Sequence, residues 1–239
     1  MSQHISRKEL KQDKIRESFE HGAEAVITHK TFVTVLLAVV CGVVIIAAGW
    51  RIYSERRNVK ASAALEEAMK IYNARIRAAS EPAETGEITY LDDSAKLQDA
   101  AAKFNVVADR FPSTNPGKLA RYYSALCLEG LGRYNQALEQ LQKVNSGGDK
   151  ELNALTRYQM AQVHARTGKT EEAVKIYREL ADQPSVFVPR GLILLELAGQ
   201  LRATNPKEAA NLYAQIKKEF PDTAIAEAAD RGLEALPKS

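Results

Sequence analysis

Apolar residues are concentrated in one uninterrupted stretch near the start of the chain. Residues 31–50, TFVTVLLAVVCGVVIIAAGW, carry no charged side chain, and Lys30 and Arg51 flank them. A helix of this length spans about 30 Å, which is the hydrocarbon thickness of a bilayer. The pattern predicts one transmembrane helix over 31–50, with Trp50 and Arg51 as its interfacial anchor. It divides the chain into a polar tail (1–30), the span and a body (51–239).

The length of the apolar stretch also separates it from a cleaved signal peptide, whose apolar region usually has about 7–15 residues. Its orientation is less clear. Arg16 and Lys30 precede it within about 15 residues, and a larger basic group follows it. That group is Arg51, Arg56, Arg57 and Lys60. The positive-inside rule alone would keep the body in the cytoplasm, but long domains translocate with little regard to charge, so the charges leave the orientation open.

The body repeats one helical pattern. Residues 128–144 and 164–180 match in every spacing, including the turn glycines Gly132 and Gly168. A small residue recurs every 36 or 37 positions, at Ala100, Ala137, Ala173 and Ala209. This period resembles that of the tetratricopeptide repeat, which is about 34 residues. The sequence therefore predicts an all-α fold, in which the transmembrane helix precedes a TPR-like α-solenoid of antiparallel helix pairs.

Two segments precede the first clear repeat. Residues 57–79 have an apolar stripe at helical spacing, at Leu65, Met69, Tyr72 and Ile76, and are expected to form the first helix of the solenoid. Residues 81–93, EPAETGEITYLDD, are acidic and lack periodicity, so an acidic loop is expected there. β-branched residues do not alternate in the body, so no strand is predicted.

Charge and cysteine content narrow the possible functions only a little. The body has 27 Lys and Arg residues against 25 Asp and Glu residues, so the clustered basic face of a nucleic-acid-binding protein is not expected. Cys41 lies in the predicted span and Cys127 in a predicted helix of the body. They cannot form a disulfide within one chain.

Motifs for catalysis or metal binding are not found. CxxC, HExxH and GxSxG are all absent. Gly168-Lys169-Thr170 imitates the end of a P-loop, but Val163 stands where its first glycine should be, so these residues are expected to form the repeat's turn. His164 is expected to be a satisfied histidine between helices. The sequence thus predicts a protein that is not an enzyme, with no cofactor, metal or small-molecule substrate.

A repeat array offers a concave wall formed by the first helix of each pair. Counting from the turn glycines, this wall should present six residues as a protein-binding groove. They are Tyr122, Leu126, Glu129, Tyr158, Gln162 and Arg166. Aromatic and polar side chains of this kind suit an extended or unfolded peptide. Packing of Tyr122 and Tyr158 between repeats is an equally weighted alternative.

Three short motifs resemble one known family. Gly49-Trp50-Arg51-Ile52-Tyr53 is followed by residues 61–65, ASAAL, and residues 71–74, IYNA. This series is similar to the start of YfgM-type proteins, ancillary subunits of the bacterial SecYEG translocon. The resemblance implies a single-pass protein of the bacterial inner membrane, with a cytoplasmic N-terminal tail and a periplasmic TPR domain. The implied partners are SecYEG, a periplasmic chaperone and unfolded secretory chains.

The predicted function is therefore a membrane-anchored TPR protein-binding module that acts as a translocon subunit and chaperone-like factor for secreted proteins. The alternative is a TPR scaffold for a cell-envelope or cell-division assembly. A scaffold should bind one folded partner tightly, whereas a chaperone-like factor should bind many unfolded chains weakly.

Overall fold

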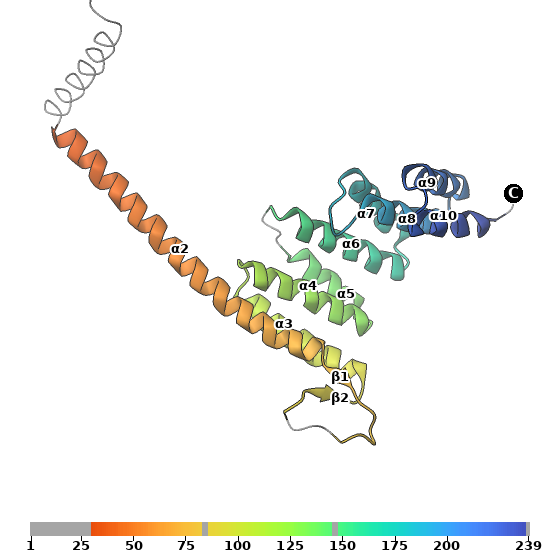
Figure 1. Ribbon diagram of the computed structural model, residues 1–239, viewed down its shortest axis with the longest axis horizontal. Coiled ribbons are helices and arrows are strands. Elements are labelled where there is room, and N and C mark those ends of the chain that lie inside the picture. The colour runs from red at the N-terminus through yellow and green to blue at the C-terminus, as the bar shows by residue number, and fades with distance from the viewer. Residues whose placement is uncertain (1–29, 83–85, 145–147, 238–239) are drawn as a thin grey trace, which may run out of the picture. The chain divides into compact units, whose positions relative to one another are not determined.

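The computed structural model describes residues 30–82, 86–144 and 148–237, so most of the predicted tail lies outside the described residues. The chain forms two compact units, Met1–Arg56 and Arg57–Ser239. Figure 1 shows the order of the elements. They are α2 (Lys30–Tyr72), β1 (Arg75–Ile76), β2 (Thr89–Tyr90), α3 (Asp93–Arg110), α4 (Asn115–Gly130), α5 (Tyr134–Gln142), α6 (Lys150–Arg166), α7 (Thr170–Asp182), α8 (Arg190–Leu201), α9 (Pro206–Glu219) and α10 (Ala224–Glu234).

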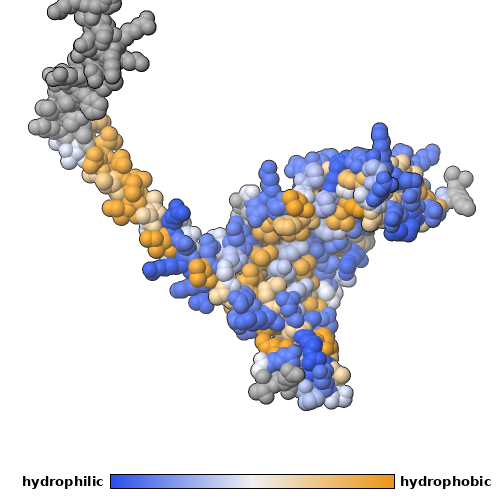
Figure 2. All heavy atoms as spheres, viewed as in Figure 1, coloured by the Kyte–Doolittle hydropathy of each residue, from blue (hydrophilic) through white to orange (hydrophobic). Residues whose placement is uncertain are grey.

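The described part of the first unit is the N-terminal portion of α2. This helix contains a stretch that is long and apolar enough to cross a membrane, with a mean hydropathy of 2.4 over its most apolar window. No residue of that window is buried, and Figure 2 shows the stretch as a continuous apolar surface. The ring centroids of Trp50 and Tyr53 lie 6.4 Å apart, where the apolar stretch meets the charged part of α2. Trp50 and Arg51 are both exposed on α2, as an interfacial anchor requires.

The second unit begins with the C-terminal portion of α2. Ala61 and Ala68 are fully or almost fully buried there, in the same cluster as residues of α3. The predicted helix over 57–79 is too long, because α2 ends at Tyr72. The ring of Tyr72 packs edge-on against Phe104 and Tyr123, with centroids 6.0 and 5.6 Å away. Ile76, which the helical stripe included, lies in a strand instead.

The segment between α2 and α3 contains two strands that the sequence did not predict. β1 and β2 pair in parallel, with Arg75 opposite Thr89 and Ile76 opposite Tyr90. The Arg75 guanidinium lies 2.8 Å from the Glu81 carboxylate and 3.5 Å from that of Glu87. Part of the predicted acidic loop, Thr89–Tyr90, is therefore a strand. Backbone pairing with β1 and the ion pairs of Arg75 hold the segment between α2 and α3 together.

Helices α4–α5, α6–α7 and α8–α9 form successive pairs, and α10 packs on α8 and α9. The turns within the first two pairs use Gly132 and Gly168, whose φ values of 72° and 75° favour glycine. The four periodic alanines, Ala100, Ala137, Ala173 and Ala209, have no exposed surface. Small side chains thus lie where each second helix packs most closely, and the predicted all-α, TPR-like solenoid is confirmed.

The core of the repeat domain consists of two clusters of buried residues, one spanning α2 to α6 and the other α6 to α10. Phe104, which is completely buried, stacks on Tyr123 with the ring centroids 5.4 Å apart. Cys127 is completely buried in the same cluster, and burial raises the pKa of its thiol to about 12. These contacts join α2, α3 and α4 into one packed body.

Candidate protein-binding surface

The predicted groove residues lie on α4 and α6, the first helices of two successive pairs. Tyr122 is only 9% exposed, and its ring packs edge-on against Tyr123 with the centroids 5.8 Å apart. Leu126 is half-buried against the N-terminal core cluster. Tyr122 and Leu126 therefore lie mostly beneath the surface of the domain, and they offer a partner little side-chain area.

Glu129, near the end of α4, is a buried carboxylate with partners on α6. The Gln159 amide donates a hydrogen bond to Oε2, and the Arg166 guanidinium Nε lies 3.3 Å from Oε1. Oε1 itself accepts no hydrogen bond from the described residues. Burial raises the pKa of Glu129 above its usual range, and Arg166 and Gln159 oppose this rise. The Glu129 side chain is 7% exposed and the Arg166 side chain is 59% exposed. Together they give this surface a polar centre.

Tyr158 connects α6 to α8. Its hydroxyl donates a hydrogen bond to Glu196 Oε1 at 3.1 Å, and the Gln162 amide donates to the hydroxyl oxygen at 2.8 Å. Burial, followed by the charge of Glu196, raises the pKa of Tyr158. The tyrosine therefore stays protonated and acts as a donor across two repeats.

The structure thus brings the predicted residues into two contact groups, Glu129 with Arg166 and Tyr158 with Gln162. Sequence reasoning missed Gln159 and Glu196, which complete the two groups. The repeat period predicts that a third first helix follows α7, but it does not identify Glu196 on that helix. We use the name inner polar face for the polar and aromatic surface formed by one residue of α4, three of α6 and one of α8: Glu129, Tyr158, Gln162, Arg166 and Glu196.

His164 differs from its prediction. Its Nδ1 atom is buried and has no hydrogen-bond partner among the described residues, so this ring nitrogen is unsatisfied. Burial lowers its pKa, and the nearby Lys169 lowers it further. The neutral imidazole costs less to bury than the charged form. The described residues also contain no group of His, Cys, Asp and Glu side chains that could hold a metal ion.

The raised pKa of Glu129 predicts a specific pH dependence of stability. In the interval between the unfolded pKa, about 4.3, and the higher folded value, the folded chain binds more protons, so stability falls as pH rises. Glu129→Gln should remove this decline, so the stability of the variant relative to the parent should rise as pH increases through this interval. Urea unfolding of both proteins across this range measures the difference.

Glu139→Gln is the matched control, because a hydrogen bond and charge from Lys143 lower the pKa of Glu139. The stability that Glu139 contributes is present above its unfolded pKa and is lost as pH falls through its folded pKa. The stability of Glu139→Gln relative to the parent should therefore fall, rather than rise, as pH increases. A Glu129→Gln curve that runs parallel to the parent would contradict the predicted desolvation of Glu129.

Comparison with known proteins agrees with this architecture. Two solved structures similar to the chain are a putative kinesin light chain from Podosopora anserina with nearly identical TPR-like repeats, and a variant of that same protein. Their TM-scores are 0.50 and 0.51, each at 16% identity over 73% of this chain and 83% of the other. At this identity the likeness shows the fold alone. No curated protein matches the chain.

The family comparison covers the apolar stretch and the first repeats together. The family described as a tetratricopeptide repeat-like domain matches residues 29–187, which is well over half of the chain. Domains of this kind are protein-binding repeat modules. The chain belongs to the tetratricopeptide repeat-like domain family.

Proposed function

We propose that this protein is anchored in a membrane by the apolar stretch of α2 and binds other proteins on its inner polar face. The observation that carries this proposal is the joined polar surface over α4, α6 and α8. There the hydroxyl of Tyr158 bonds to Glu196 of the next repeat, and Arg166 remains 59% exposed. The exposed Arg166 guanidinium, together with the half-buried polar side chains that these bonds hold in place, suits contacts with an extended segment.

The proposed partners are SecYEG and the secretory chains that leave it, together with a periplasmic chaperone. The support for this choice is the YfgM-like motif series over 49–74 and the position of the apolar stretch directly before the repeats. The tail would be cytoplasmic and the repeat domain periplasmic. Anchoring beside the exit site would raise the effective concentration of clients, so weak contacts on the inner polar face would suffice.

Photo-cross-linking in intact membranes tests the surface and the partner together. A benzophenone amino acid at position 166 should cross-link secretory chains and translocon subunits, because Arg166 is an exposed residue of the inner polar face. The matched control is the same probe at position 175, since Lys175 is exposed on α7, a second helix of a pair. The yield of these adducts should be several times higher from position 166.

Equal yields from both positions would rule out the inner polar face as the binding site. A single stoichiometric envelope protein, without translocon subunits, would instead favour the scaffold alternative. Digestion of a C-terminal tag by protease added outside right-side-out spheroplasts would support the periplasmic placement. Protection of the tag until lysis would overturn that placement and the translocon function with it.

A further inference from the structure

The loop between α7 and α8 presents two apolar side chains to solvent. Val186 is 81% exposed and Phe187 is 63% exposed, although the loop around them is well bonded. Their backbone N–H groups donate to the two carboxylate oxygens of Glu151, at 3.2 and 3.0 Å. Val188, the next residue, is buried in the core, and its N–H donates to the Ser185 hydroxyl at 3.1 Å. The two apolar side chains are therefore held outward by a fixed backbone.

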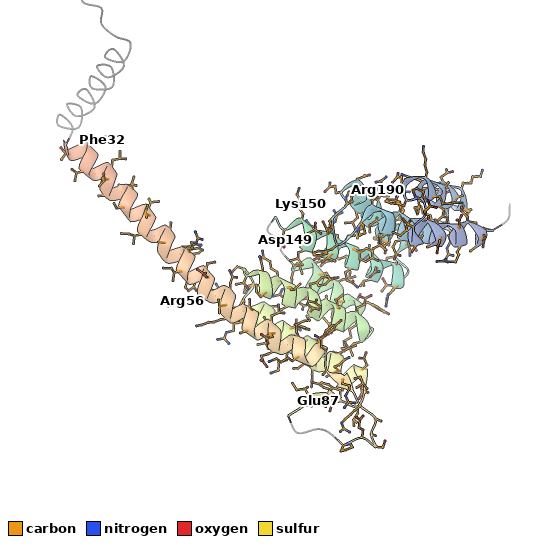
Figure 3. The ribbon with its side chains drawn as sticks, in the orientation of Figure 1. Phe32, Arg56, Glu87, Asp149, Lys150 and Arg190 are labelled. Atoms are coloured by element: carbon orange, nitrogen blue, oxygen red, sulfur yellow. The ribbon has the colours of Figure 1, made fainter. Side chains whose placement is uncertain are left out.

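This loop lies at one particular end of the repeat domain, the end at which α4, α6 and α8 begin. Glu151 is in the first turn of α6, and Arg190, the first residue of α8, lies 3.2 Å from Glu219 at the end of α9. Figure 3 shows Asp149, Lys150 and Arg190 on the side of the repeat domain away from Glu87, which lies near β2. We call this the helix-start end.

The chain also enters the repeat domain at the helix-start end. The Arg57 guanidinium donates to the backbone carbonyl of Arg110, the last residue of α3, at 3.4 Å. Since α4 begins only a few residues after Arg110, Arg57 lies near the start of α4. The first residue of the repeat domain and the α7–α8 loop are therefore at the same end.

Covalent continuity then limits how far this end can lie from the bilayer. Residues 51–56 alone separate the apolar stretch from Arg57, and even a fully extended chain of this length reaches only about 25 Å. If the apolar stretch spans a membrane, as the proposed function requires, it tethers Arg57 within about 25 Å of the lipid headgroups. The strands β1 and β2 lie farther along the chain, beyond the end of α2.

We propose that the α7–α8 loop is a second membrane contact, in which Val186 and Phe187 insert into the interfacial region of the bilayer. Burial of exposed apolar side chains at this depth is favourable, and an aromatic ring suits the interface. The contact would be weak in a free domain, but the tether makes it intramolecular.

Tryptophan fluorescence in proteoliposomes tests this contact in the full chain. The chain has a single tryptophan, Trp50, so Trp50→Phe combined with Phe187→Trp leaves one reporter in the loop. In phosphatidylcholine brominated near the upper acyl carbons, this reporter should lose about half of its emission, since interfacial side chains reach about 5–10 Å into the headgroup and acyl boundary. The matched control is Leu91→Trp in the same background, because Leu91 is 56% exposed beside β2. It should keep its emission.

Equal quenching at positions 187 and 91, or no quenching at 187, would overturn the inference. A reporter at 187 that is unquenched by lipid and shifts its emission only when a protein is added would also overturn it, and would show protein docking instead. Quenching of Trp50 in the parent chain separates this result from the proposed function. If Trp50 is quenched and position 187 is not, the anchor stands and only the second contact fails.

Discussion

Replacing Gly117 by alanine is expected to destabilise the repeat domain by about 3 kcal/mol, the upper part of the usual range for overpacking. A Cβ at this position would lie 1.9 Å from the backbone oxygen of Phe111. That oxygen cannot move away easily, because it accepts hydrogen bonds from the Thr114 N–H at 3.1 Å and from the Thr114 hydroxyl at 2.9 Å. Urea unfolding followed by circular dichroism measures the loss.

Gly199→Ala is the matched control. Gly199 also lies within a helix, but nothing is found within 4 Å of the position that its Cβ would take. Alanine is the better helix former, so this variant should be more stable than the parent by up to about 1 kcal/mol. If both variants lose stability to the same extent, the close approach at Gly117 is not the cause.

Phe104→Ala should produce a loss of similar or larger size, about 4 kcal/mol, as expected for removing a buried phenylalanine. The side chain is completely buried between Tyr72 of α2 and Tyr123 of α4, so truncation opens a cavity where three helices meet. Protection of α2 amides after Arg57 against hydrogen exchange should fall together with the free energy of unfolding, because Tyr72 of α2 loses its ring contact with Phe104.

Val106→Ala, two residues along the same helix, separates cavity formation from a general effect on α3. Val106 is 64% exposed, so its truncation should change stability by less than about 0.5 kcal/mol. A Phe104→Ala variant that behaves like Val106→Ala would mean that α2 does not pack on α3 as described.

The repeat architecture could be predicted because its requirements fall on single residues with a fixed period. Where two helices cross closely, only a small side chain fits, and so alanine recurs at Ala137, Ala173 and Ala209. Where the chain reverses within a few residues, a positive φ is needed, and Gly132 and Gly168 supply it. Such local constraints remain visible in one sequence.

The features that the sequence did not predict depend on contacts between distant residues. α2 ends at Tyr72, and Arg75 and Ile76 pair with Thr89 and Tyr90 instead, which helical periodicity cannot reveal. Strands of two residues are too short for alternation to appear. The bond from Tyr158 to Glu196 joins residues 38 positions apart, so it becomes apparent only when α6 and α8 are placed side by side.

The rate at which the Cys127 thiol is modified can report how often the folded state opens. The thiol is completely buried and its pKa is raised to about 12, so an alkylating reagent meets almost no thiolate while α2, α3 and α4 stay packed. The modification rate of Cys127 therefore depends on how often these helices separate. In an oxidising compartment the same burial sets a time limit: mixed disulfides with other chains can form at this cysteine until the first repeat closes over it, and not afterwards.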